Sequence, residues 1–118
     1  DDYPTSDGTG KRDYIHVEDL ANAHALSINY FEKTNNSFSV FNLGTGKSFS
    51  VLEVIKAFEE ATSIKIPYQI VKRRDGDVCE SLADPSKAKL ELGWEAKFDL
   101  KRMCIDSWRW QSINPKGI

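Results

Sequence analysis

The stretch from Phe38 to Glu53, FSVFNLGTGKSFSVLE, decides the fold class of this 118-residue chain. Its first six residues are mostly apolar and predict a strand that ends at the glycine turn Gly44-Thr45-Gly46. Ser50 and Glu53 then match a capping box, in which a hydroxyl and a carboxylate satisfy the free N–H groups at a helix start. The stretch therefore predicts a strand, a tight turn and a helix, as found in α/β domains.

The residues on both sides continue this alternation of strands and helices. After a loop over 1–10, residues 12–17 combine β-branched and aromatic side chains that suit a short extended segment. Three- and four-residue spacing predicts a helix over 18–33. Its predicted inner face consists of Leu20, His24, Ser27, Ile28 and Phe31.

The second half of the chain adds one strand and three helices to this prediction. A helix is expected over 51–61 and a strand over 64–72. Asp84-Pro85 opens a short helix that Gly93 closes, and Asp99 caps the last helix. The order β-α-β-α-β-α-α indicates an α/β domain with a few short strands and about four helices.

Composition excludes several classes of protein. Hydrophobic residues make up 40% and charged residues 29% of the chain, which is typical of one globular domain. The net charge of −2 argues against a nucleic-acid partner, which normally selects a basic excess. No apolar run reaches the roughly 18 residues needed to span a bilayer. Two cysteines fit a reducing, cytoplasmic location. The sequence starts at Asp1 rather than Met, which leads us to expect a piece of a longer protein.

The charged stretch Val71-Lys72-Arg73-Arg74-Asp75-Gly76-Asp77 is a candidate anion-binding segment. An arginine fork matches two phosphate oxygens, and Gly76 allows a tight backbone turn. Asp77 has acceptors for neighbouring hydroxyls such as a sugar diol. The alternative is a solvated turn that is rich in local ion pairs.

Two further motifs resemble known sites but lack required parts. Gly44-Thr45-Gly46-Lys47-Ser48 matches the second half of a P-loop, but Phe41 stands where the first glycine is required. The stretch is thus either an anion-binding helix start or only a tight strand-to-helix connection. Tyr68 and Lys72 match a dehydrogenase Tyr-x-x-x-Lys pair, which needs a helix. An extended segment would separate them by roughly 13 Å. Neither a metal site nor a catalytic residue is predicted.

Five motifs in order resemble the C-terminal part of the UDP-glucose 4-epimerases, which are extended short-chain dehydrogenase/reductases. The motifs are DGTGKRDYIHV (7–17), FNLGTG (41–46), RRDGD (73–77), ADPSKA (83–88) and LGW with WRWQ (92–94 and 108–111). The resemblance implies that residues 1–118 form the small C-terminal UDP-sugar-binding domain. It also implies that the N-terminal Rossmann domain, which binds NAD and carries the catalytic residues, is absent from this chain.

The resemblance also implies which residues bind the substrate. Arg12 and Arg74 match the arginines that hold the diphosphate, and Asp77 matches the carboxylate on the uridine ribose. Tyr14 matches a residue of the substrate pocket, and Lys47 lies where the glycine turn of the family faces the nucleotide.

Ser81 stands where family members carry either a bulky tyrosine or a small residue beside the hexose. By resemblance, a small side chain there leaves room for an N-acetyl group, so UDP-N-acetylhexosamines are expected as further substrates.

The resemblance predicts a parent enzyme that interconverts UDP-glucose and UDP-galactose through a 4-keto intermediate with NAD. We expect that parent to be a cytoplasmic homodimer, and this chain alone to be inactive and prone to self-association through an unpaired strand at 38–43. One alternative is another NAD-dependent nucleotide-sugar epimerase or dehydratase. The other is a non-catalytic protein-interaction module.

Overall fold

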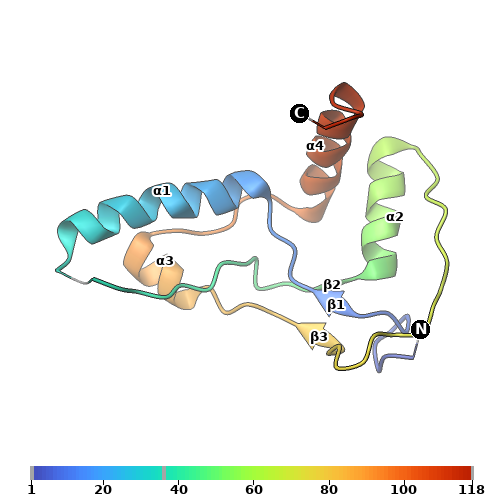
Figure 1. Cartoon of the computed structure of the whole chain (residues 1–118), viewed down its shortest axis with the longest axis horizontal. Coiled ribbons are helices and arrows are strands. Elements are labelled where there is room, and N and C mark those ends of the chain that lie inside the picture. Colours follow the sequence, from blue (N-terminus) through green and yellow to red (C-terminus); the bar gives the residue numbers. More distant parts are fainter. Residues whose placement is uncertain (1, 36, 118) are drawn as a thin grey trace.

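The structure is a computed structural model that describes residues 2–35 and 37–117. This part of the chain forms seven elements (Figure 1): β1 (Lys11–Arg12), α1 (Val17–Lys33), β2 (Phe49–Ser50), α2 (Val51–Thr62), β3 (Glu80–Ser81), α3 (Ser86–Leu92) and α4 (Leu100–Ile113). The predicted α/β class is confirmed, with its alternating order, few short strands and four helices.

The three strands form a small mixed sheet with β1 in the centre. β1 pairs antiparallel with β2 and parallel with β3. The register places Arg12 opposite Phe49 on one side and opposite Ser81 on the other. The sheet therefore brings two segments that are distant in sequence next to Arg12.

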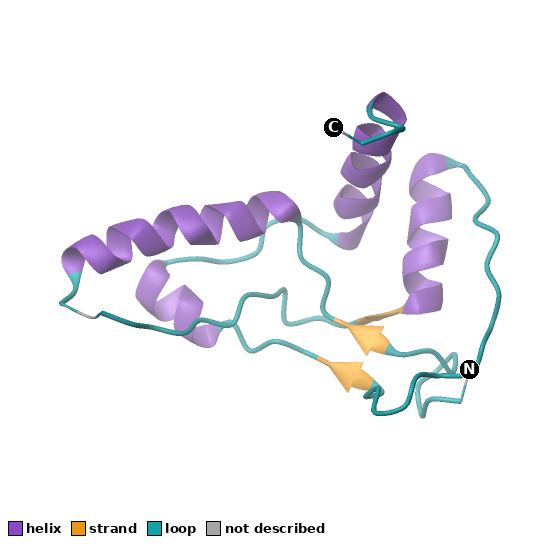
Figure 2. Ribbon diagram, in the orientation of Figure 1, coloured by secondary structure: helices purple, strands orange, loops and turns teal. Residues whose placement is uncertain are grey.

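Two of the predicted strands were placed wrongly. Residues 38–43 and 64–72 run as loops (Figure 2), and the strands β2 and β3 form at 49–50 and 80–81 instead. Apolar and β-branched residues favour an extended backbone, but a strand also needs a hydrogen-bonded neighbour. Within the described residues neither segment pairs in the sheet, so self-association through an edge at 38–43 stays a prediction.

The helix boundaries agree better with the sequence, because they depend on local caps. The Ser50 hydroxyl accepts from the Glu53 N–H at 3.1 Å while the Glu53 carboxylate accepts from the Ser50 N–H at 2.7 Å, so the predicted capping box is confirmed. Asp99 caps α4, and Gly93 ends α3 with φ of +65°. α3 begins one residue later than predicted, with the Asp84 carboxylate accepting from its first N–H.

The predicted inner face of α1 was wrong. Asp19 and Ala23 are buried, whereas Leu20, Ile28 and Phe31 are exposed. The buried positions precede the predicted ones by one residue, which is a rotation of about 100° around the helix axis. The helix has apolar residues on two faces, and periodicity alone does not say which face meets α3.

The core lies between α1 and α3 and is centred on Trp94. This side chain is 1% exposed and packs with Ala23 and Ala88. Its indole N–H donates to the Asp19 carbonyl at 2.9 Å, and the Asp19 carboxylate accepts from the Lys97 N–H at 3.0 Å. These bonds fasten the segment after α3 to the start of α1.

The α2 and α4 helices form a second packed pair, which stands upright above the sheet in Figure 1. Phe58 and Trp108 meet edge to face with ring centroids 6.0 Å apart. The described part of the chain thus consists of two helix pairs that the small sheet and its loops connect (Figure 2).

The packing is more open than in a compact domain. The radius of gyration is 17.0 Å, against about 13.5 Å expected for a compact domain of this length. Val17, Ile28, Phe38 and Val40 are each more than half exposed. No helix of the described residues has the length and hydrophobicity to cross a bilayer.

Candidate functional site

A cavity of about 480 Å³ lies beside β1, and we call it the basic pocket. It is lined by the N-terminal loop with Arg12 and Tyr14, by the start of α2, and by the loop 68–74 with Asp77. Four of the six predicted site residues therefore line one cavity: Arg12, Tyr14, Arg74 and Asp77. The residues 68–72 are loop rather than helix, as expected if the Tyr-x-x-x-Lys match is coincidental.

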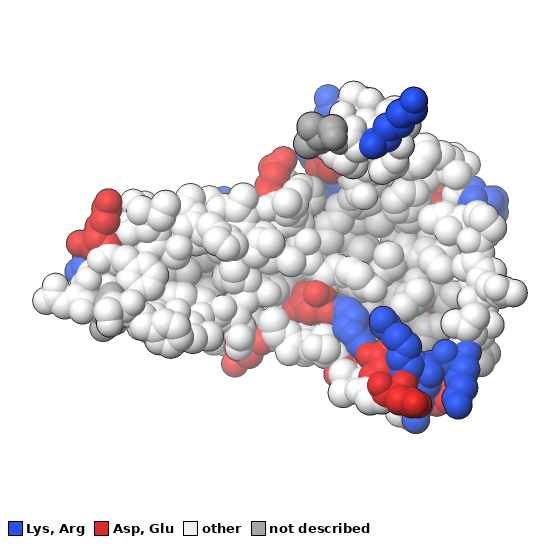
Figure 3. All heavy atoms as spheres, in the orientation of Figure 1, with Lys and Arg blue, Asp and Glu red and all other residues white. Residues whose placement is uncertain are grey.

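The basic pocket combines four cations with a single carboxylate among its lining residues. Arg12, Lys72, Arg73 and Arg74 supply the positive charge, and Asp77 supplies the negative charge. Figure 3 shows blue and red side chains gathered at one end of the molecule, below the helix pair α2 and α4. Such a site favours an anion with hydroxyl groups attached, because cations attract the anion and the carboxylate accepts from the hydroxyls.

The guanidinium of Arg12 is fixed by three hydrogen bonds. Nη1 donates to the Lys11 carbonyl at 2.7 Å and to the Val78 carbonyl at 3.0 Å, and Nη2 donates to Asp77 Oδ1 at 2.5 Å. The Arg12–Asp77 ion pair joins residues 65 positions apart. The charges of this stretch therefore also make a long-range contact, in addition to any local ion pairs of the turn.

Tyr3 completes this arrangement and was missed by sequence reasoning. Its hydroxyl donates to Asp77 Oδ2 at 2.8 Å, and the Arg73 guanidinium lies over its ring, 5.3 Å from the centroid. No local pattern connects residues 74 positions apart. In the sequence, Tyr3 is visible only as a tyrosine in the turn-rich segment 1–10, and nothing there indicates its partner.

Hydrogen bonding shifts the pKa values of this pair in opposite directions. The bond from Tyr3, followed by the charge of Arg12, lowers the pKa of Asp77, and the same bond raises the pKa of Tyr3. Because the pKa of Asp77 is lower in the folded state, its contribution to stability is present above the pKa of the unfolded chain. That contribution is lost as pH falls through the folded value.

Asp13 holds the glycine turn in place. Its Oδ1 accepts from the N–H and the hydroxyl of Thr45 at 2.9 and 2.7 Å, and its Oδ2 accepts from the Gly46 N–H at 2.9 Å. The turn amides therefore bind a carboxylate of the protein itself. Of the two interpretations of this turn, the structure supports the tight connection.

Gly44 is expected to tolerate no side chain in this turn. A Cβ atom there would lie 2.5 Å from both the Ala83 Cβ and Asp13 Oδ2. We expect Gly44→Ala to lower the free energy of unfolding by about 2 kcal/mol, as overpacking does. Urea denaturation, followed by circular dichroism, measures this loss of stability. Gly46→Ala is the control, because a Cβ atom at Gly46 would meet open space, although the φ of Gly46 is positive. A loss under about 0.5 kcal/mol would contradict the close packing.

The remaining two predicted residues lie elsewhere. Lys47 is exposed and does not line the basic pocket. Ser81 lines a neighbouring cavity of about 430 Å³ together with Arg12 and Asn42. Arg12 lines both cavities, so it connects Ser81 to the basic pocket, but the structure does not bring Lys47 to either.

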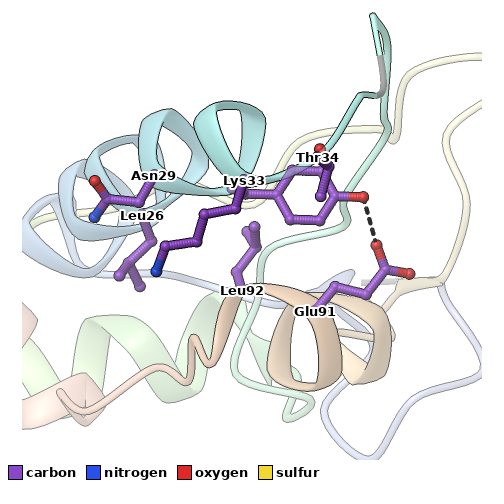
Figure 4. Close-up of a pocket in the computed structure, with 7 residues that line it drawn as sticks. Leu26, Asn29, Lys33, Thr34, Glu91 and Leu92 are labelled. Carbon is purple, nitrogen blue, oxygen red and sulfur yellow. Dashed lines mark hydrogen bonds between the residues drawn. The ribbon is translucent and has the colours of Figure 1, made fainter.

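Another cavity, of about 540 Å³, lies between the end of α1 and α3 (Figure 4). Leu26, Lys33 and Leu92 line it, and the Tyr30 hydroxyl donates to Glu91 at 3.0 Å across it. It contains none of the predicted site residues and lacks the concentration of cations of the basic pocket.

The buried His16 and the partly exposed Asp106 resemble a catalytic dyad, but the ring has no free nitrogen. His16 Nδ1 accepts from the Glu18 N–H at 3.0 Å, so the proton is on Nε2, which lies 3.2 Å from Asp106 Oδ2. The ring caps α1 and ties it to α4. No group of three metal-ligating side chains occurs among residues 2–35 and 37–117, and Cys79 and Cys104 are both free.

Known proteins resemble this chain closely over nearly its whole length. UDP-glucose 4-epimerase of Bacillus subtilis is 56% identical over 118 residues, which cover 98% of this chain and 34% of that protein. A crystal structure of the Bifidobacterium longum UDP-glucose 4-epimerase with NAD+ and UDP matches with a TM-score of 0.92 and 51% identity, over 100% of this chain and 35% of the other. The Stenotrophomonas maltophila enzyme, with NAD and formylated UDP-arabinopyranose, matches with a TM-score of 0.90 and 54% identity, over 96% and 33%.

The chain thus spans about a third of the length of the curated relatives it matches. A family model described as GDP-mannose 4,6 dehydratase matches residues 2–107. The chain therefore belongs to the GDP-mannose 4,6 dehydratase family.

Proposed function

We propose that residues 1–118 are the C-terminal UDP-sugar-binding domain of an NAD-dependent UDP-glucose 4-epimerase. The observation that carries this proposal is the basic pocket, where Arg12, Arg74 and Asp77 line one cavity. The relatives that match nearly the whole chain are UDP-glucose 4-epimerases, one of them with NAD+ and UDP bound. The chemistry of the pocket and the similarity point to the same ligand.

Each pocket residue has a role in this proposal. Arg12 and Arg74 hold the diphosphate, because guanidinium groups donate two parallel hydrogen bonds to phosphate oxygens. Asp77 accepts from the ribose hydroxyls, and Tyr14 contacts the substrate beyond the diphosphate. Binding energy gained at the nucleotide then positions the hexose for chemistry that residues outside this chain perform.

The reaction interconverts UDP-glucose and UDP-galactose, and NAD supplies the hydride acceptor. We assign NAD to a Rossmann domain outside this chain. The glycine turn at 44–46 does not fit the cofactor, since its amides at Thr45 and Gly46 already bind Asp13. This chain therefore contributes affinity and orientation rather than proton or hydride transfer, and alone it is inactive.

The open packing supports a place within a larger protein. Val17, Ile28, Phe38 and Val40 expose apolar surface that a compact domain would bury, and the radius of gyration is 17.0 Å. The relatives are about three times as long as this chain. We assign these exposed side chains to the face that packs against the remainder of the protein. A cytoplasmic location and a homodimeric parent stay predictions of the resemblance.

In this proposal, the small side chain of Ser81 determines which sugars the enzyme accepts. It lines the cavity of about 430 Å³ next to Arg12, and its small side chain leaves room for an N-acetyl group on the sugar. UDP-N-acetylhexosamines are therefore proposed as additional substrates. For Lys47 we retain only a peripheral contact with the nucleotide, because its side chain lies outside the basic pocket.

A second candidate is a different nucleotide-sugar enzyme, such as a dehydratase, which the description of the family model favours. Product analysis of the full-length protein with UDP-glucose distinguishes the two. UDP-galactose is the product of an epimerase, and a 4-keto-6-deoxy sugar is the product of a 4,6-dehydratase.

Arg74→Ala tests the nucleotide site. We expect KM for UDP-galactose in the full-length protein to rise about tenfold, because one charge-assisted contact to phosphate is lost. Arg109→Ala, which removes an exposed arginine of α4, is the control and should leave KM unchanged. An unchanged KM in the Arg74→Ala protein would remove this residue from the site.

Titration of the present chain with UDP tests the domain itself. Amide resonances near Arg74 and Asp77 should shift in NMR spectra at millimolar UDP. If these resonances do not shift, the result would favour the alternative of a non-catalytic interaction module.

A further inference from the structure

We propose that Tyr3 is a positioning residue, which orients the Asp77 carboxylate toward the ribose hydroxyls of a bound nucleotide. This inference rests on the proposed function and adds a residue to its site. Tyr3 lines the basic pocket together with Gly8, Thr9 and Gly10 of the same loop. The loop 3–10 thereby forms one wall of the nucleotide site.

The Asp77 carboxylate is held at both oxygens. Arg12 donates to Oδ1 at 2.5 Å and Tyr3 donates to Oδ2 at 2.8 Å. A carboxylate has about four acceptor positions on its two oxygens. One bond at each oxygen therefore fixes the plane of the group and leaves acceptor positions for the two hydroxyls of a diol. Without Tyr3 the carboxylate would rotate more freely about its bond to Cβ.

The loop that carries Tyr3 is itself held by several hydrogen bonds. The Tyr3 N–H donates to the Gly8 carbonyl at 3.2 Å, and the Thr5 hydroxyl donates to the Thr9 carbonyl at 2.7 Å. Asp7 accepts a hydrogen bond from the Ser50 hydroxyl at the start of α2. The phenol thus acts from a structured loop that is anchored to a helix, as positioning requires.

The ring and the hydroxyl of Tyr3 have separate contacts. The ring lies under the Arg73 guanidinium, 5.3 Å from its centroid, and Arg73 Nε lies 3.6 Å from Asp2 Oδ2. A phenylalanine at position 3 keeps the ring and removes only the hydroxyl. Tyr3→Phe is therefore a selective probe of the bond to Asp77.

The protonation states suit this role. The raised pKa of Tyr3 and the lowered pKa of Asp77 keep the proton on the phenol. The carboxylate is then ionised and only accepts hydrogen bonds, which is the state that receives ribose hydroxyls. The groups facing it, Arg12 and Arg74, are cations that favour the same state.

The test compares UDP with 2′,3′-dideoxy-UDP, which lacks both ribose hydroxyls. NMR titration of the present chain should show that Tyr3→Phe raises Kd for UDP about fivefold. The Kd for the dideoxy nucleotide should change less than twofold, because that ligand makes no bond to Asp77. Tyr30→Phe is the matched control, since it removes a tyrosine–carboxylate bond to Glu91 outside the basic pocket.

Each other result overturns the inference. Equal weakening of both nucleotides would show a merely structural effect, and unchanged binding of both would show that Tyr3 is not needed. Absence of UDP binding by the unaltered chain would overturn the proposed function together with this inference. Independently of any ligand, the pKa of Asp77 measured by NMR should rise in the Tyr3→Phe chain. An unchanged pKa would mean that the hydrogen bond does not orient the carboxylate.

Discussion

Trp94→Ala is expected to lower the free energy of unfolding by about 4 kcal/mol, the range for a large aromatic side chain removed from a core. Trp94 is 1% exposed and is the largest fully buried side chain among the described residues. Its removal leaves a cavity between α1 and α3 and deprives the Asp19 carbonyl of the indole donor at 2.9 Å. The described core is small, so one tryptophan accounts for much of it.

Urea denaturation followed by tryptophan fluorescence and circular dichroism measures this loss. Trp110→Ala is the matched control, because that side chain is 47% exposed on α4. We expect the control to cost about 1 kcal/mol or less. Similar losses for the two variants would show that the packing of Trp94 is not what stabilises the fold.

Asp13→Ala is expected to cost about 3 kcal/mol and to weaken UDP binding. The carboxylate accepts from the N–H groups of Thr45 and Gly46, and hydrogen bonds to a charged group contribute about 1.5–3 kcal/mol each. The side chain is partly buried, so water replaces some of what is lost. Release of the turn also loosens β2, which pairs with the strand that carries Arg12.

Denaturation and UDP titration on the same variant separate these two effects. Asp75→Ala removes an exposed carboxylate from the loop before β3 and should leave stability within about 0.5 kcal/mol. If Asp13→Ala were as stable as Asp75→Ala, the turn at 44–46 would be held by its own backbone rather than by Asp13.

Helix ends were predictable because their signals are local. Ser50 and Glu53 are three residues apart, Asp99 directly precedes α4, and the glycine at 93 has the positive φ that its type allows. Each of these features depends on a neighbour within one turn. The sequence therefore predicted both ends of α1, α2 and α3 within one or two residues, and the start of α4.

Strand positions and the inner face of α1 were not predictable, because they depend on residues that are distant in sequence. β1 takes its partners from 49–50 and 80–81, and no periodicity within two residues distinguishes such strands from loops. The residues 38–43 and 64–72 have stronger strand patterns and yet remain loops. Which face of α1 is buried depends on α3, more than fifty residues later.

The residues of the candidate site also divide into those that the sequence predicted and those that it did not. Arg12, Tyr14, Arg74 and Asp77 follow from motif resemblance, and the structure places them around one cavity. Tyr3 and Asp13 act on partners 74 and 32 positions away. Such pairs become visible only when the chain is folded, and both belong to the groups that hold the site rather than to those that would touch the ligand.

The hydroxyl of Ser50 both accepts from the Glu53 N–H and donates to Asp7, in a residue that is fully buried. Aspartate is as good a helix cap as serine, but here it would set two carboxylates against each other. Threonine would add a methyl group to a side chain that has no exposed surface. A redesign of this domain therefore has to keep at position 50 a small side chain that both accepts and donates a hydrogen bond.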